Sequence, residues 1–301
     1  MSEPKTLRES RAEARAEARA KRADRRAEAA RRAAATPHAQ AQQSRIDALM
    51  GPLGEYFEST GFWNNGWWEA DTLTAAEAST NLMERLLEFL PEKRGAVLDV
   101  ACGYGATTQC LTRHFPPASI AAVDISDAKL EYGRRNAPGC AFERMDATHL
   151  TYPDASFDVV LCVESAFQFE SRRRFLAEAR RVLRPGGRLL IADILHEPRA
   201  EALSRRVHPE NYLKDPAAYV TLLASLGYTA AEVIDATEPC WTRSVRDKTR
   251  FVGRAYWRGA IDRPIFNRIM TAGLLSLLST RYYVLASATR PLLDPLPESA
   301  A

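Results

Sequence analysis

The sequence predicts a doubly wound α/β domain built on one parallel sheet. Between 96 and 194, short β-rich apolar runs alternate with helix-forming stretches, which is the pattern of a parallel sheet covered on both faces. A glycine turn follows the first run in AVLDVACGYGATT (96–108), and an acidic residue lies in or ends each of the first three runs. In such sheets ligands bind beyond the carboxyl ends of the strands, so a site is expected there.

The folded part of the chain carries a small negative charge. The 301 residues have a formal net charge of +3, but residues 1–32 hold eleven Lys/Arg and six Asp/Glu, so the rest of the chain carries −2. The basic pI of about 8.6 therefore reflects the N-terminal region. Composition gives no reason to expect a nucleic acid or an anionic membrane as the partner of the folded body.

The cysteines and the apolar runs predict a cytoplasmic protein. Five cysteines are odd in number, widely spaced and without a CxxC pair, which favours reduced thiols over disulfides or a zinc site. No run of 18 apolar residues and no apolar N-terminal segment is present, so we expect neither membrane insertion nor a secretory signal.

Residues 1–44 predict a basic arm and linker. Within 7–35 the chain repeats Arg-Ala-Glu-Ala, which combines good helix formers with charges spaced to pair, but has no apolar face apart from alanine. The plain interpretation is a solvated helix or a disordered arm. An arm that binds RNA, lipid or a protein partner is the alternative, whereas the acidic residues argue against an organelle transit peptide.

A single folded domain is predicted over 45–290. A short helix is expected within 45–61 and a longer one at 74–90, with leucines near helical spacing. Between them, FWNNGWW (62–68) crowds four aromatic residues around a polar turn. These rings either pack as ordinary core or roof a ligand pocket, since aromatic faces suit both a purine and a sulfonium cation.

The alternating region predicts the body of the sheet. Strands are expected at 96–100, 119–126, 140–147, 157–164 and 187–194, and helices at 106–115, 127–136 and 171–183.

The region beyond 194 predicts two further strands and a helical insertion. Helices are expected at 216–226 and about 245–275, and strands at 230–237 and 281–289, the last apolar enough to lie inside the sheet. Helices inserted between the last two strands would form a lid over the carboxyl edge, and we assign the lid to about 195–275. Residues 291–301 predict a frayed tail.

The glycine turn and the acidic residues together indicate a nucleotide site. As a dinucleotide fingerprint GxGxxG the turn fits badly, because Thr108 stands where glycine or alanine should allow close packing. Asp124 ends the second strand about twenty residues after the turn, where a carboxylate can accept two hydrogen bonds from a ribose diol. Asp146 ends the third strand and could accept from an adenine amine. One such carboxylate could be merely a cap, and an NAD(P)-dependent oxidoreductase remains the alternative.

Five segments, VLDVACGYG, AVDIS, MDAT, FDVVLCVES and RVLRPGGRLLIADI, resemble in order and spacing the class I S-adenosylmethionine-dependent methyltransferases over roughly 50–290. The resemblance implies a Rossmann-like seven-stranded sheet, S-adenosyl-L-methionine as cofactor, and methyl transfer. In this family the glycine turn faces the methionine end, the second-strand acid the ribose and the third-strand acid the adenine. The cofactor contacts it implies are Tyr56, Trp67, Asp99, Ala101, Gly103, Gly105, Asp124, Ile125, Asp146, Ala147 and Glu164. Ala101 is a mild departure, since many members have glycine there.

The aromatic segment and VESAFQFESRRRFLAEARRVLRPGG are similar to the small-molecule methyltransferases, which include sugar and fatty-acid O-methyltransferases and tocopherol C-methyltransferases. That similarity implies a small-molecule acceptor, with nucleic acid expected at most through the arm. We expect a monomer or a weak homo-oligomer.

The catalytic group is where the chain departs from these relatives. Gln168 stands where the sugar O-methyltransferases have a histidine base, and glutamine can orient an acceptor but cannot take its proton. Asp193 and His196 could replace that base, or could only hold and border a loop. We expect metal-independent O-methylation, with C- or N-methylation as the alternative and an inactive cofactor-binding or RNA-tethered protein as the other class.

Overall fold

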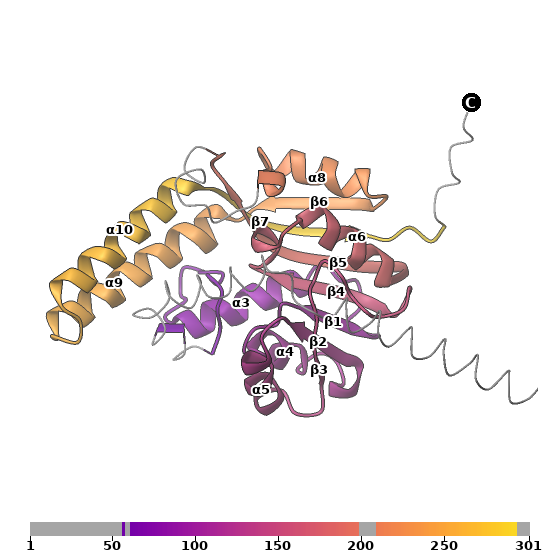
Figure 1. Cartoon of the computed structure of the whole chain (residues 1–301), viewed down its shortest axis with the longest axis horizontal. Coiled ribbons are helices and arrows are strands. Elements are labelled where there is room, and N and C mark those ends of the chain that lie inside the picture. The colour runs from indigo at the N-terminus through magenta and orange to yellow at the C-terminus, as the bar shows by residue number, and fades with distance from the viewer. Residues whose placement is uncertain (1–55, 58–60, 199–208, 294–301) are drawn as a thin grey trace, which may run out of the picture.

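A seven-stranded sheet in the order β3-β2-β1-β4-β5-β7-β6 forms the centre of the computed structural model (Figure 1). The structure describes residues 56–57, 61–198 and 209–293. The predicted arm and linker, most of the short helix expected within 45–61, and most of the predicted tail lie outside these residues.

The first five strands are parallel, as the alternating pattern predicts, and two antiparallel pairings complete the sheet. The parallel strands are β1 (Val97–Val100), β2 (Ile120–Asp124), β3 (Ala141–Arg144), β4 (Phe157–Val163) and β5 (Leu183–His196). β7 (Thr280–Thr289) runs antiparallel between β5 and β6 (Thr229–Asp235). The prediction that the last strand lies inside the sheet is confirmed, and its residues 283–288 are all buried.

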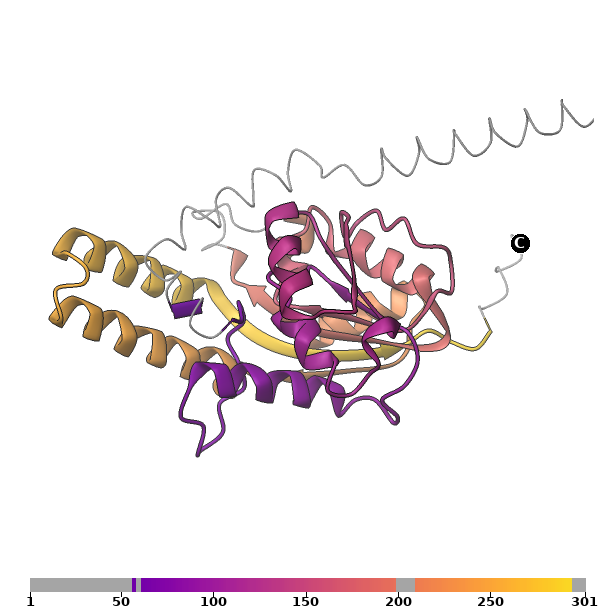
Figure 2. The same ribbon diagram turned by 90° about the horizontal axis from the view of Figure 1, so that it is seen from below.

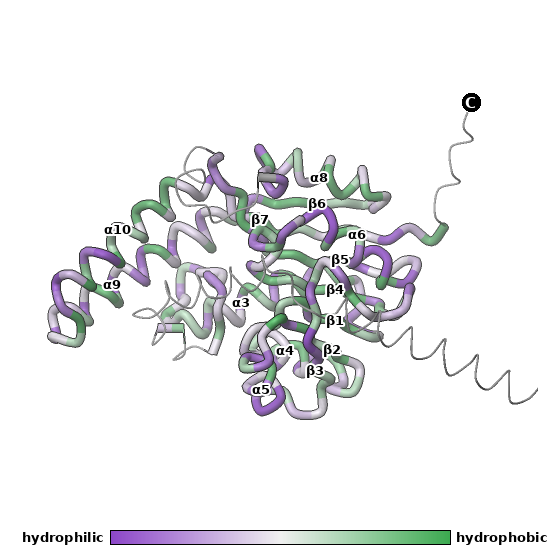
Figure 3. Tube along the Cα trace, in the orientation of Figure 1, coloured by the Kyte–Doolittle hydropathy of each residue, from purple (hydrophilic) through white to green (hydrophobic). Residues whose placement is uncertain are grey.

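Helices cover both faces of the sheet, which confirms the doubly wound class. α3 (Ala75–Leu87), α4 (Ala106–Leu111) and α5 (Asp127–Asn136) lie on one face, and α6 (Arg172–Val182) and α8 (Pro216–Ser225) on the other. Figure 3 shows the apolar residues gathered along the central strands between these layers. Side-chain caps define several helix starts, and the residues that accept the capping hydrogen bonds are Thr74, Ser126, Ser171 and Asp215.

A helical hairpin is inserted between β6 and β7. η4 (Thr237–Thr242) leads into α9 (Arg243–Trp257), and α10 (Arg263–Ser279) returns beside it. The two helices extend away from the sheet in both views (Figures 1 and 2), and Tyr256 stacks on Phe266 between them. Because the hairpin leaves and re-enters at the same edge of the sheet, β7 has to run against its neighbours.

The assignment of the lid to 195–275 is wrong in its first part. α8 packs on β6 and contributes Tyr219 and Leu223 to the main core, so both elements belong to the sheet and its covering layer. The stretch expected as helical over 245–275 is two helices, joined by a turn at 258–262. In the described part of the chain, no helix is both long and apolar enough to cross a membrane.

Gly105 allows α4 and α5 to approach closely. It has a φ of +81°, and a Cβ there would lie 2.6 Å from the Cα of Gly133 in α5. Thr108, the misfit to the dinucleotide fingerprint, is fully buried and uses its hydroxyl to bind Asp99 instead of serving helix packing. The close contact between α4 and α5 is therefore made by Gly105 and Gly133 and not at Thr108.

Gly105→Ala is expected to lower the free energy of unfolding by about 2–3 kcal/mol, through left-handed strain and the clash with α5. Urea denaturation measures the loss. Gly103→Ala is the matched control: its φ is +56° but no atom lies within 4 Å of the added Cβ, so a loss of only about 1 kcal/mol is expected. Equal losses for the two variants would contradict the packing role.

Candidate functional site

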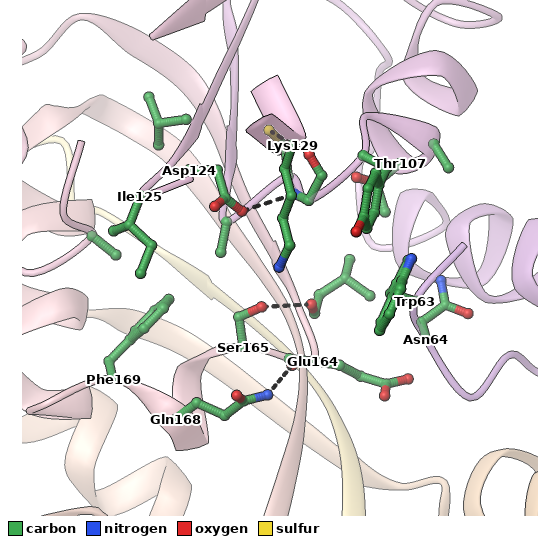
Figure 4. Close-up of a pocket in the computed structure, with 18 of the residues that line it drawn as sticks. Trp63, Asn64, Thr107, Asp124, Ile125, Lys129, Glu164, Ser165, Gln168 and Phe169 are labelled. Carbon is green, nitrogen blue, oxygen red and sulfur yellow. Dashed lines mark hydrogen bonds between the residues drawn. The ribbon is translucent and has the colours of Figure 1, made fainter. Parts of the chain in front are cut away.

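The candidate site is a cavity at the carboxyl edge of the parallel strands (Figure 4). Its wall is formed by the glycine turn after β1, the ends of β2, β3 and β4, and the aromatic segment that precedes α3. Of the residues to which the resemblance assigns cofactor contacts, the following line it: Ala101, Gly103, Asp124, Ile125, Asp146, Ala147 and Glu164.

The glycine turn is held from behind by Asp99. This carboxylate is 1% exposed and accepts hydrogen bonds from the hydroxyls of Thr107 and Thr108, each at 2.7 Å. Burial raises the pKa of Asp99 to about 6, although the two hydroxyls oppose the shift. Among the described lining residues Thr107 is present and Asp99 is not, so Asp99 positions the turn from outside the cavity.

Ala101 adopts the left-handed conformation that glycine takes freely. Its φ is +58°, a backbone conformation that glycine adopts without a Cβ penalty. Non-glycine residues in this region cost free energy and are found where the surrounding structure requires them. Glu164, at the end of β4, has a φ of +51° and lies across the same cavity. Two strained residues therefore border the site.

Asp124 ties the glycine turn to the end of β2. Its carboxylate accepts from the backbone N–H of Gly103 at 3.0 Å and from that of Ser126 at 2.9 Å. In Figure 4 the side chain stands beside Ile125 on the cavity wall. Asp124 therefore lies at the end of the second strand and on the cavity wall, where the sequence places it.

Asp146 is fixed at the end of β3 by its own loop. One carboxylate oxygen accepts from the backbone N–H and the hydroxyl of Thr148, both at 2.8 Å. The Thr148 hydroxyl also contacts Nδ1 of His149. Asp146 and Ala147 line the cavity, as do Ile125 and Phe169, which lie on one side of it in Figure 4.

Glu164 is part of a buried polar network. Its carboxylate accepts from the backbone and side-chain amides of Asn65 and from the Tyr283 hydroxyl at 2.8 Å. Lys248 of α9 donates to Oδ1 of Asn65 at 2.6 Å. Burial raises the pKa of Glu164 to about 7 and lowers the pKa of Lys248 to about 8. The network joins the aromatic segment, β4, β7 and the helical hairpin.

The aromatic segment supplies Trp63 to the cavity and turns Trp67 away. Trp63 stacks on Tyr104 at 5.4 Å between ring centroids, and the ammonium of Lys129 lies 6.0 and 5.8 Å from these two centroids. Both views of the segment hold in part, since Phe62 also packs into the core.

Trp67, which the resemblance assigns to the cofactor, lies away from the cavity in this structure. Gly66 has a φ of +73° and sits against Ala78 of α3, so the chain reverses there and Trp67 lies under the guanidinium of Arg85, 4.9 Å from its ring centroid. Within the described residues, Trp67 is not part of the cavity wall. The reversal at Asn64-Asn65-Gly66 was visible in the sequence, but which tryptophan faced inward was not.

Tyr56 and Gly105, two further predicted cofactor contacts, are also not among the described residues that line the cavity. The Tyr56 hydroxyl donates to Asp247 of α9 at 2.9 Å, and its ring packs on Phe251. Gly105 is the N-cap residue of α4 and is not among the described lining residues of the cavity.

The structure places Asp193 and His196, the predicted replacements for the histidine base, outside the described cavity wall. Asp193 is fully buried and bound to Arg172 at 2.8 Å and to the Tyr219 hydroxyl at 3.0 Å. His196 is 8% exposed and packs on the ring of Phe167. Neither is among the described lining residues of the cavity, and the carboxylate of Asp193 is bound within the protein by Arg172 and Tyr219.

Gln168 lies where the sequence predicts it. It lines the cavity from η2 (Ala166–Gln168), and its Nε2 donates to the backbone carbonyl of Glu164 at 3.4 Å (Figure 4).

The chain is similar in sequence to known methyltransferases. Residues 98–191 match the family model described as a methyltransferase domain. The chain is 34% identical over 210 residues, 63% of this chain and 75% of the relative, to 27-O-demethylrifamycin SV methyltransferase from Amycolatopsis mediterranei. It is 49% identical over 116 residues to phthiotriol/phenolphthiotriol dimycocerosates methyltransferase 1 from Mycobacterium ulcerans, a match that covers 38% of this chain and only 43% of that relative.

A solved structure shares the fold with little sequence identity. The [4+2]-cyclase SpnF superposes with a TM-score of 0.64 at 20% identity, over 84% of this chain and 96% of the cyclase. Its name describes a cyclisation, so the shared fold alone does not determine the reaction.

Proposed function

The chain belongs to the class I S-adenosylmethionine-dependent methyltransferases, and on this premise we propose that it methylates a hydroxyl oxygen of an apolar small molecule. S-adenosylmethionine is the cofactor, and a small molecule is the acceptor. The choice of a hydroxyl rests chiefly on one observation: Glu164, a carboxylate with its pKa raised to about 7, lines the cavity.

The cavity wall has the chemistry that the cofactor requires. Asp124 offers carboxylate oxygens at the end of β2 for a ribose diol, and Ile125 and Phe169 offer apolar contacts for a base. At the other end, the stacked rings of Trp63 and Tyr104 already lie within 6.0 Å of one cation, the ammonium of Lys129. Aromatic faces favour a sulfonium for the same electrostatic reason.

The apolar nature of the acceptor is supported by two observations. The relatives described above are named for a rifamycin and for phthiotriol dimycocerosates. Phe62 and Val163 add apolar surface to the cavity wall. An acceptor of this kind would gain binding energy from burial and would exclude water from the reacting atoms.

The methyl group of the cofactor is already activated by the positive sulfur. What the chain has to supply is alignment of the acceptor oxygen and a destination for its proton. Glu164 is held by Asn65 and Tyr283 and can take that proton in its ionised form. Gln168 can orient the hydroxyl by hydrogen bonding. This assignment moves the base from the fifth strand to the fourth.

C- or N-methylation is the second candidate, because Gln168 occupies the position at which the sugar O-methyltransferases have histidine. An activated ring carbon or an amine of low pKa needs less help from a base. The products distinguish the two functions. The protein is incubated with methyl-labelled cofactor and with 27-O-demethylrifamycin SV or a long-chain secondary alcohol; an O-methyl signal in the product supports the proposal, and a C- or N-methyl signal opposes it.

Glu164→Gln is expected to lower kcat/KM by about 100-fold and to flatten its pH profile. In the wild type, kcat/KM should rise with pH with an apparent pKa of about 7, because the ionised carboxylate accepts the proton. Stability has the opposite trend. Burial favours the protonated form in the fold, so stabilisation is complete below pH 4.5 and is lost as pH rises to about 7.

The matched control for this variant is Glu143→Gln on the exposed part of β3, where the side chain accepts a hydrogen bond from the Tyr152 hydroxyl at 2.9 Å. It should keep both profiles. A pH profile of kcat/KM for Glu164→Gln that still rises near pH 7 would show that another group takes the proton.

A further inference from the structure

Asn64 has a buried side-chain amide whose two polar atoms have no hydrogen-bond partner in the described part of the chain. The residue is 7% exposed and lines the cavity, and neither Oδ1 nor Nδ2 is bound by any group of the described chain. Its neighbour Asn65 is the opposite case: Oδ1 accepts from Ser244 and Lys248, and Nδ2 donates to Glu164. Buried polar atoms are nearly always paired, so an unpaired amide facing a cavity points to a ligand.

The position of Asn64 is fixed from both sides. Trp63 stacks on Tyr104, the residue between Gly103 and Gly105, and Asn65 is bound to the carboxylate at the end of β4. Asn64 is therefore held between the glycine turn and β4. Figure 4 shows it beside Trp63 and on the side of Thr107 and Glu164, with Ile125 and Phe169 at the opposite side. Asn64 therefore lies at the end of the cavity that is away from Ile125 and Phe169.

We propose that the amide of Asn64 binds the α-amino-carboxylate end of the cofactor. Oδ1 accepts from the ammonium and Nδ2 donates to the carboxylate, so one side chain satisfies a zwitterion with its donor and its acceptor. The proposal rests on the proposed function only for the identity of the cofactor. It assigns Asn64 a role in cofactor affinity, whereas a role in acceptor binding would leave that affinity unchanged.

Two probes isolate this contact. S-adenosylhomocysteine carries the amino-carboxylate, and 5′-methylthioadenosine has the same nucleoside and a thioether but lacks it. Calorimetric titration of Asn64→Ala should show about a tenfold or greater loss of affinity for S-adenosylhomocysteine, as expected for charge-assisted hydrogen bonds, and a change of less than about twofold for 5′-methylthioadenosine. Asn64→Asp, which keeps the shape but repels the carboxylate, should lose at least as much with the first probe only.

Thermal melting without ligand provides the structural control. Asn64→Ala should melt no lower than the wild type, because its amide has no partner to lose, whereas Asn65→Ala should melt lower. The proposal is overturned if both probes are weakened equally, or if neither is weakened by either variant. Failure of the wild type itself to bind S-adenosylhomocysteine would instead refute the proposed function, so the two failures are distinguishable.

Discussion

Asp193→Asn is expected to lower the free energy of unfolding by about 3–5 kcal/mol. Asp193 is fully buried, and its partner Arg172 is 1% exposed. The guanidinium also donates to the backbone carbonyls of Ile194 and Asn211, and these neutral groups leave its charge uncompensated when the carboxylate is removed. The Tyr219 hydroxyl and the Phe167 N–H lose a charged acceptor as well. A network with so many members is costly to leave partly satisfied.

Urea denaturation measures this loss. Glu238→Gln is the control, since Glu238 is 62% exposed, lies 3.8 Å from Arg246, and should contribute less than about 0.5 kcal/mol. Turnover per folded molecule of Asp193→Asn, measured at a temperature where both proteins are folded, should stay close to that of the wild type. A stable variant without turnover would restore Asp193 as a catalytic group.

Asp124→Ala is expected to weaken S-adenosylhomocysteine binding by at least about 100-fold. The carboxylate positions the glycine turn through the Gly103 N–H and keeps oxygen atoms on the cavity wall for a ribose diol. Each hydrogen bond to a charged group contributes about 1.5–3 kcal/mol, so losing two reaches this factor. The variant should still fold, because β2 keeps its pairing with β1 and β3.

Calorimetry with S-adenosylhomocysteine measures the affinity. Asp127→Ala is the matched control: this carboxylate begins α5 three residues later, its side chain is 73% exposed, and it lies 3.5 Å from Arg144. The Asp127→Ala variant should bind S-adenosylhomocysteine with the affinity of the wild type. A loss of less than about threefold in Asp124→Ala would mean that Asp124 only holds the turn.

Sequence patterns predicted the sheet well because its strands are short, apolar and separated by helices, and such runs have few ways to be buried. The same logic placed Asp124 and Asp146 at one edge, since the ends of parallel strands meet there. It failed for the range of the lid. The sequence predicts a strand at 230–237, but its pairing with β7 is what shows that β6, within the range assigned to the lid, is part of the sheet.

The predicted site residues that the structure places outside the cavity wall are held there by contacts between distant segments. The sequence suggests Asp193 as a base at a strand end. In the structure, Arg172 of α6 forms an ion pair with the Asp193 carboxylate at 2.8 Å. Trp63 and Trp67 are two tryptophans on either side of one turn, and the sequence does not distinguish them. In the structure the turn includes Gly66, and Trp63 is the one that lines the cavity. Asn64 is conspicuous only because it lacks the partners that Asn65 has, which no pattern in the sequence reveals.

Thermal melting with and without S-adenosylhomocysteine tests the assignment of the cavity most directly. Saturating ligand at about 100 times its Kd should raise Tm by about 5 °C, while NADH at the same concentration should leave Tm unchanged. The shift should disappear in Asp124→Ala. Stabilisation by NADH, or no response to S-adenosylhomocysteine in the wild type, would contradict the methyl-donor site.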